Sequence, residues 1–122
     1  MKKLLILLFT LIALNAYAVN KSTTFTNDLF KQAQLEGKTV VINSWEETCT
    51  TCKKQIKFLD QAEKEFSNIL FLSFEQTKDK DIAKQLSIDY WTTIVIYKNN
   101  KEVYRSIGQT DKAKIYEAIK SL

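Results

Sequence analysis

Hydrophobic and polar residues alternate along this chain in short blocks whose period changes between that of a helix and that of a strand. Apolar runs rich in β-branched residues and bounded by polar ones predict buried strands, and these runs occupy 38–45, 69–74, 93–97 and 102–107. Apolar residues three and four positions apart predict amphipathic helices at 28–35 and 78–86. Two more helices are predicted. The helix after Cys49 has an apolar face made of Ile56, Leu59, Ala62 or Glu63, and Phe66. The helix at the C-terminus has an apolar face made of Ile115, Ile119 and Leu122.

Local signals indicate where several of these elements begin and end. Thr26 or Asn27 can accept hydrogen bonds from the first helix, and Gly37 suits its C-terminal stop. Asn99-Asn100 separates the last two strands, where asparagines tolerate the positive φ angles of a tight hairpin. Thr110 can cap the final helix.

The expected order of elements is helix, strand, helix, strand, helix, strand, strand, helix. Strands separated by helices imply right-handed parallel crossovers, and the closing pair of strands implies one antiparallel hairpin. We therefore expect an α/β protein with a mixed sheet and helices on both faces. No repeat, linker or low-complexity segment divides residues 19–122, which are expected to form one domain.

The first 18 residues have the layout of a secretory signal peptide. A basic start, Met1-Lys2-Lys3, precedes an apolar run over 4–14, and Asn15-Ala16-Tyr17-Ala18 supplies the small residues of a cleavage site. The run is too short to span a bilayer, which needs about 20 apolar residues. We expect cleavage after Ala18 and a periplasmic or secreted protein.

Composition narrows the chemistry that is available. The 122 residues include no histidine, no proline, two cysteines and a single methionine, Met1. Histidine-based triads, zinc-bound imidazoles and thioether copper sites are therefore excluded. The net charge of +4 comes from lysines interspersed with acids, without a basic stripe, so nucleic-acid binding is not expected. No cofactor or bound metal is predicted beyond the chemistry of the two cysteines.

The two cysteines form the motif Cys49-Thr50-Thr51-Cys52 between a buried strand and a helix. A helix N-terminus stabilises a thiolate, and two intervening residues let the second sulfur resolve a mixed disulfide on the first. Three other interpretations stay open: half of a zinc site completed by carboxylates, a structural disulfide in a very short loop, and chance. The position of the motif, after a predicted strand and at the start of a predicted helix in a chain expected to be exported, favours a redox-active dithiol.

Residues 40–53, V-V-I-N-S-W-E-E-T-C-T-T-C-K, resemble the active-site strand and turn of thioredoxin. The stretch 93–100 is similar to a later strand and hairpin of that family, and Ile107-Gly108 before an amphipathic helix also matches. Residues 25–45 further resemble domains of periplasmic thiol:disulfide interchange proteins. The resemblance implies a thioredoxin-like fold and thiol–disulfide exchange, with Cys49 as the attacking thiol and Cys52 as the resolving thiol.

Near the cysteines, several positions depart from the family pattern. Thr50-Thr51 replaces Gly-Pro, and the resemblance implies that this pair tunes the redox potential. Lys53 is a further candidate tuning residue, because it adds positive charge beside the cysteines. Asn43 stands where the family has a buried aspartate, and an amide cannot act as a general base. Proton transfer from Cys52 would then need water, or Glu46 or Glu47.

A further departure lies at Trp91-Thr92, where the family carries a cis-proline facing the cysteines. A cis bond before a non-proline residue costs about 2.5–4 kcal/mol, so this peptide is either strained or trans. The resemblance implies that Trp91, Thr92 and Trp45 line a substrate groove. Loss of the proline is also associated, in that family, with metal or iron–sulfur capture by the dithiol.

These features predict an exported thiol-disulfide oxidoreductase that reduces or rearranges disulfides in substrate proteins. Its partners would be protein disulfides or thiols and a membrane-bound electron donor or acceptor. The direction of electron flow is open, and the compact length favours reduction or interchange. The alternative is a non-enzymatic thioredoxin-fold binding module, or a metal- or iron–sulfur-holding protein, in which the cysteine pair is a structural disulfide or a ligand set.

Overall fold

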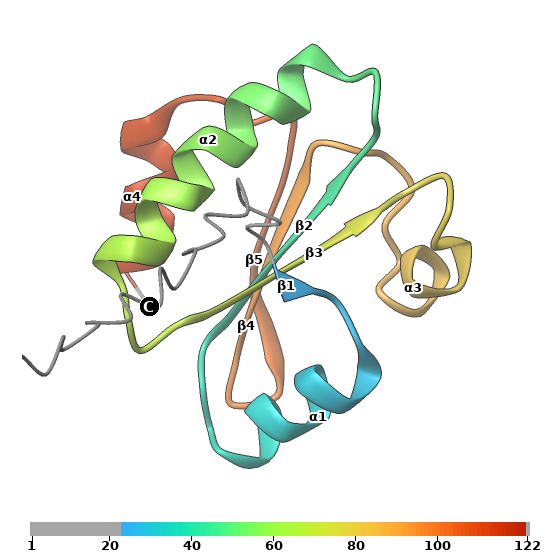
Figure 1. Cartoon of the computed structure of the whole chain (residues 1–122). Helices are drawn as coiled ribbons and strands as arrows, with labels where there is room; N and C mark the ends of the chain where they lie inside the picture. Colours follow the sequence, from blue (N-terminus) through green and yellow to red (C-terminus); the bar gives the residue numbers. More distant parts are fainter. Residues whose placement is uncertain (1–22, 122) are drawn as a thin grey trace, which may run out of the picture.

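The computed structural model describes residues 23–121, so the predicted signal peptide and Leu122 lie outside the described residues. Figure 1 shows a central twisted sheet with helices on either side. The strands are β1 (Thr23–Thr24), β2 (Val40–Trp45), β3 (Leu70–Glu75), β4 (Thr93–Lys98) and β5 (Lys101–Ile107). The helices are α1 (Asn27–Leu35), α2 (Thr50–Glu65), α3 (Lys80–Gln85) and α4 (Lys112–Lys120). Within 23–121, none of these helices has the length and apolar character needed to cross a bilayer.

The strands form one mixed sheet in the order β1-β3-β2-β4-β5. The predicted mixed sheet and closing hairpin are confirmed, since β2 runs parallel to β3 and β4 runs antiparallel to β5. The expectation that helix-linked strands run parallel is wrong for β4, which is antiparallel to β2. The reason is that the chain after α3 re-enters the sheet where β2 ends, and Thr93 pairs with Ser44. The two-residue β1 was not predicted, because two residues show no periodicity.

The helices cover both faces of the sheet, as predicted. Alternate residues of β2 point to opposite faces, so Val40 and Ile42 pack with α1 and α3 while Val41 packs with α2 and α4. Figure 1 shows the two helix pairs on opposite sides of the strands. The sheet is therefore buried on both faces, which explains the continuous apolar runs in its central strands.

Three of the predicted turn and cap signals are confirmed. Gly37 follows the C-cap residue of α1 with a φ of 68°, as the predicted stop of that helix requires. Thr26 caps α1, and its side chain accepts a hydrogen bond from the Leu29 N–H at 3.1 Å. Asn99 and Asn100 adopt φ angles of 51° and 66° in the turn between β4 and β5, as a tight hairpin requires. The cap predicted for the last helix is wrong by one residue: Asp111, not Thr110, accepts from the Lys114 N–H.

Helix α2 is rotated relative to the predicted apolar face. Its buried residues are Cys52, Gln55, Leu59 and Ala62, whereas Ile56 is only partly covered. A buried glutamine on this face therefore takes the place that periodicity assigned to an isoleucine. This rotation brings Cys52 against the sheet, next to the segment that precedes β4.

Candidate active site

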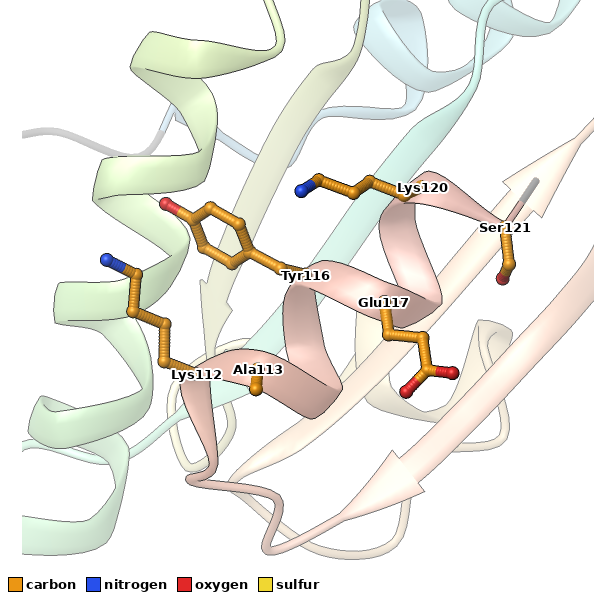
Figure 2. A pocket seen from close by; sticks show the side chains of 6 residues that line it. All are labelled: Lys112, Ala113, Tyr116, Glu117, Lys120 and Ser121. Carbon is orange, nitrogen blue, oxygen red and sulfur yellow. The ribbon is translucent and has the colours of Figure 1, made fainter.

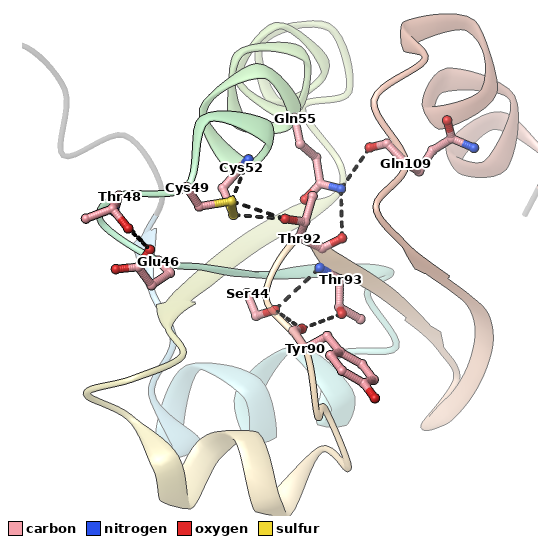
Figure 3. The surroundings of a disulfide bond; sticks show 10 residues. All are labelled: Ser44, Glu46, Thr48, Cys49, Cys52, Gln55, Tyr90, Thr92, Thr93 and Gln109. Carbon is pink, nitrogen blue, oxygen red and sulfur yellow. Dashed lines mark hydrogen bonds between the residues drawn. A yellow bond between two sulfur atoms is a disulfide. The ribbon is translucent and has the colours of Figure 1, made fainter.

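Cys49 and Cys52 are joined in a disulfide at the N-terminus of α2 (Figure 3). The strand β2 ends at Trp45, and a short turn places Cys49 as the N-cap residue of the helix. The Cys52 N–H donates to the Cys49 sulfur at 3.0 Å. A thiolate on Cys49 would therefore have one backbone donor and the partial positive charge of the helix terminus beside it.

The two sulfurs differ in their access to solvent. Cys49 is partly exposed, while Cys52 is only 1% exposed. An attacking thiol has to reach a substrate, and a resolving thiol has only to reach its neighbour. This asymmetry suits the roles that the resemblance assigns to Cys49 and Cys52.

Thr92 lies directly opposite the disulfide (Figure 3). Its Oγ1 is 3.0 Å from the Cys52 sulfur and 3.3 Å from the Cys49 sulfur. The Trp91–Thr92 peptide bond is trans, since none of the described peptide bonds is cis. Thr92 instead has a φ of 60°, in the left-handed region that β-branched residues rarely occupy.

Three hydrogen bonds hold the backbone of Thr92 in this conformation. Its N–H donates to the Ser44 carbonyl at 2.9 Å, and its carbonyl accepts from the Gly108 N–H at 2.8 Å. The same carbonyl accepts from the side chain of Gln55 at 3.2 Å. Gln55 was not predicted as a site residue, although a polar residue among the apolar positions of α2 was a usable signal.

A groove of about 350 Å³ opens beside the disulfide. Its walls are formed by Cys49 and Thr51 on one side and by Trp91 and Thr92 on another, and Trp91 is 47% exposed. The remaining lining residues are Asp89, Tyr90, Ile107 and Gly108. The predicted groove residues Trp91 and Thr92 are therefore brought to the cysteines.

Trp45, which was also predicted to line the groove, is not among its lining residues. It ends β2 half-buried, and its carbonyl accepts from the Gln76 N–H at 2.8 Å. Because β2 and β3 are parallel and in register here, the end of β2 is held against the chain that follows β3. The sequence placed Trp45 near the cysteines but could not show which side of the turn it faces.

The predicted tuning residues occupy different environments. Thr50, Thr51 and Lys53 are exposed on the first turn of α2, whereas Asn43 is buried in β2. By strand alternation Asn43 faces the same side of the sheet as α2, and its Nδ2 has no hydrogen-bond partner among the described residues. Asn43 thus lies buried on the sheet face that α2 covers.

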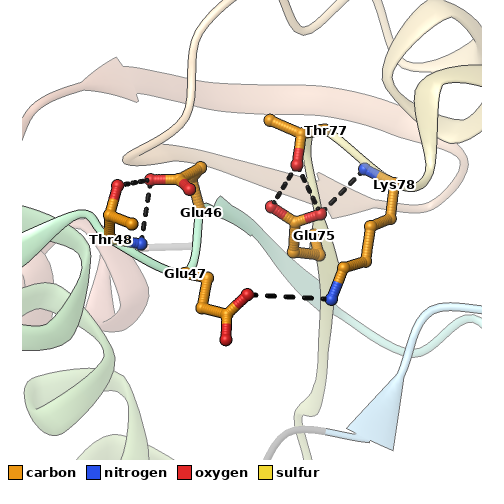
Figure 4. A network of polar contacts seen from close by, with 6 residues as sticks. All are labelled: Glu46, Glu47, Thr48, Glu75, Thr77 and Lys78. Carbon is orange, nitrogen blue, oxygen red and sulfur yellow. Dashed lines mark hydrogen bonds and ion pairs between the residues drawn. The ribbon is translucent and has the colours of Figure 1, made fainter.

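Glu46 and Glu47, the two acids before Cys49, contact Thr48 and Lys78 near the site (Figure 4). Glu46 accepts from the backbone N–H and the hydroxyl of Thr48, at 3.0 and 2.6 Å. Glu47 lies 4.0 Å from the Lys78 ammonium group. These contacts shape the turn that leads into Cys49, and a role of either carboxylate in proton transfer stays a prediction.

A third acid, Glu75, organises the adjacent turn (Figure 4). Its buried carboxylate accepts from the Thr77 hydroxyl at 2.7 and 2.8 Å and from the Lys78 N–H at 2.7 Å. Burial alone would raise the pKa of Glu75, but these hydrogen bonds outweigh it and hold the pKa below its usual value. Across residues 23–121 no three acidic or cysteine side chains gather into a metal-binding group.

A larger surface hollow of about 690 Å³ lies along α4, away from the cysteines (Figure 2). The Tyr116 ring sits between the ammonium groups of Lys112 and Lys120, at 5.1 and 5.8 Å from its centroid. Neither cysteine lines this hollow, so its size does not make it the site of thiol chemistry. The thiol chemistry belongs to the smaller groove.

Comparisons with known proteins agree with this geometry. The thioredoxin family model matches residues 17–121. The thioredoxin of Mycoplasma pneumoniae is 32% identical over 80 residues, covering 66% of this chain and 78% of that protein. The thioredoxin H-type of Fagopyrum esculentum is 27% identical over 82 residues, covering 67% and 71%.

Solved structures match the fold. Trxlp from Edwardsiella tarda superposes with a TM-score of 0.75 at 23% identity, covering 80% of this chain and 96% of that one. Oxidised mitochondrial thioredoxin 3 from Saccharomyces cerevisiae gives a TM-score of 0.74 at 21% identity, covering 84% and 97%. The predicted thioredoxin-like α/β fold is confirmed.

Proposed function

The chain belongs to the thioredoxin family and is a thiol-disulfide oxidoreductase, and from that premise we propose that it is exported and reduces or rearranges disulfides in proteins outside the cytoplasm. The observation that carries the exchange chemistry is the Cys49–Cys52 disulfide at the mouth of the groove formed by Trp91 and Thr92. Protein disulfides are the substrates that membership of this family implies.

In the reducing direction the Cys49 thiolate attacks one sulfur of a substrate disulfide. A Cys49–substrate bond forms, and the other substrate sulfur leaves as a thiolate that takes up a proton. Cys52 then loses its proton and attacks the Cys49 sulfur, which closes the Cys49–Cys52 disulfide and releases the second substrate thiol. The substrate gains two electrons and two protons, and the enzyme loses both. In the oxidising direction the same steps run in reverse.

A reduction assay tests these roles. Wild-type protein with dithiothreitol should accelerate insulin precipitation, and Cys49→Ser should fall to the background rate. Cys52→Ser serves as the matched control, because it retains the attacking thiol and should accumulate a mixed disulfide that non-reducing electrophoresis detects. Background rates for wild type, or mixed disulfides formed equally by Cys49→Ser, would contradict the assignment.

Export is supported by the signal-peptide layout of residues 1–18 and by a family match that begins at residue 17, beside the predicted cleavage site. The full chain, expressed in a Gram-negative host, should be recovered from the periplasm with Val19 as its first residue. A chain that starts with Met followed by Val19 is the control and should stay in the cytoplasm. Recovery of the full chain in the cytoplasm with Met1 intact would overturn the proposal.

We further propose the reducing or interchange direction, sustained by a membrane-bound electron donor. Titration against glutathione gives the potential of the dithiol. A value near −270 mV, as in thioredoxin, would support a reductant, and one near −120 mV would identify an oxidant.

A further inference from the structure

The hydroxyl of Thr92 contacts both sulfurs of the disulfide (Figure 3). Sulfur atoms in a disulfide carry no hydrogen, so the hydroxyl is the donor, and its single hydrogen is shared between the two contacts. Thr92 is 4% exposed, and solvent therefore has little access to this donor. A single protein hydroxyl thus serves both reactive atoms, at 3.0 Å from Cys52 and 3.3 Å from Cys49.

The position of this hydroxyl is set in advance by the fold. Thr92 is held between the Ser44 carbonyl of β2, the Gly108 N–H after β5 and the Gln55 side chain of α2. Three separate elements therefore maintain a backbone conformation that a threonine rarely adopts. A donor fixed in this way loses little freedom when it binds an anion.

We propose that the Thr92 hydroxyl is the hydrogen-bond donor that stabilises the thiolate formed on Cys49, and then on Cys52, during disulfide exchange. The inference rests on the exchange chemistry described above and adds a positioning and electrostatic role at its centre. Hydrogen bonds to an ionised acceptor are stronger than those to a neutral one, so the contact favours the thiolate over the disulfide.

The role matters most in the resolving step. Cys52 has to lose its proton, and Asn43, which faces this side of the sheet, has no basic group to receive it. A donor to the Cys52 sulfur lowers the pKa of that thiol and lets the proton pass to solvent or to the departing substrate thiolate. The Cys52–Cys49 bond forms as the Cys49–substrate bond breaks, and the Thr92 hydroxyl keeps its own proton throughout.

Thr92→Val tests the proposal, because valine keeps the branched shape and lacks the donor. We expect the thiol pKa of Cys49, followed by thiolate absorbance, to rise by about one unit. A tenfold weaker stabilisation of the reduced form corresponds to a potential more negative by about 30 mV. Thr92→Ser retains the hydroxyl and should keep both values close to those of the wild type.

Two further variants make the result decisive. Thr93→Val removes a neighbouring buried hydroxyl that donates to the Tyr90 carbonyl instead of a sulfur, and it should leave the thiol pKa unchanged. Thr92→Gly relieves the left-handed backbone and also lacks the donor, so it should raise the pKa even if the valine variant folds poorly. Equal shifts in Thr92→Val and Thr92→Ser, or none in Thr92→Gly, would overturn the proposal. Insulin reduction by the wild type tests the exchange activity separately.

Discussion

The side-chain amide of Gln55 donates to the Thr92 carbonyl over 3.2 Å. The same nitrogen donates to the Gln109 carbonyl over 2.9 Å, so one fully buried side chain joins α2 to both segments that flank the disulfide. The amide oxygen of Gln55 has no hydrogen-bond partner among the described residues, so the stabilisation comes from the two bonds of its nitrogen to the backbone that positions the site.

Gln55→Leu should therefore weaken both the fold and the site. The variant keeps the volume but removes two donated hydrogen bonds, and we expect a loss of about 1–2 kcal/mol in the free energy of unfolding, measured in urea. The rate of insulin reduction should also fall, because Thr92 loses one of its supports. Gln85→Leu, at an exposed position of α3, is the control and should change neither value. Wild-type stability in Gln55→Leu would show that the amide bonds contribute nothing.

Arg105 connects β5 to the segment that follows α3, just before the residues that line the groove. Its guanidinium donates to the carbonyls of Leu86 and Ser87, each at 2.9 Å, and pairs with Glu102. Arg105→Met keeps the aliphatic stem and should lower the free energy of unfolding by about 1–2 kcal/mol. The guanidinium chloride midpoint measures this loss, and Lys101→Met on the same strand is the control. Equal midpoints for the two variants would contradict a specific role for Arg105.

The lowered pKa of Glu75 predicts a loss of stability in acid. A carboxyl group whose pKa is lower in the folded state contributes stability above its unfolded pKa, near 4.3, and loses it as the pH falls through the folded value. Glu75→Gln should therefore be less stable than wild type at pH 7, and the difference should shrink toward pH 3. Thermal unfolding across this range gives the measurement, with the exposed Glu117→Gln as control. A difference that does not depend on pH would refute the assignment.

Asn43→Asp introduces an acid into the buried face beside α2. Burial raises the pKa of such a carboxyl group, so the variant should lose stability as the pH rises from 4 toward 8. Once ionised, the aspartate can accept the Cys52 proton, and the mixed disulfide should decay faster at high pH than in wild type. Acid-quenched samples resolved by chromatography measure that decay. Asn68→Asp, at an exposed position, is the control, and identical pH profiles for the two variants would exclude proton transfer from this position.

Much of the fold was predictable because its signals are local. The β-branched run that begins at Val40 gives a buried strand, and the Asn99-Asn100 pair specifies its turn by tolerating positive φ angles. The two sulfurs of Cys49 and Cys52 likewise come together because the residues lie three positions apart at the start of a helix. In each case the interacting residues lie within a few positions of one another.

Local patterns in the sequence were enough to predict every helix and the four longer strands, and the motif at Cys49 and Cys52 with its resemblance to thioredoxin predicted that Trp91 and Thr92 face the cysteines. The contacts that the Thr92 hydroxyl and Gln55 make there came only from the three-dimensional packing. Thr92 is 40 residues from Cys52 in the chain, and no periodicity indicates that its hydroxyl lies 3.0 Å from that sulfur. The antiparallel direction of β4 and the inward rotation of Gln55 also depend on how distant segments pack. These long-range contacts arise because helices pack on both faces of the sheet and bring distant segments together. The chemistry of the site depends on that packing.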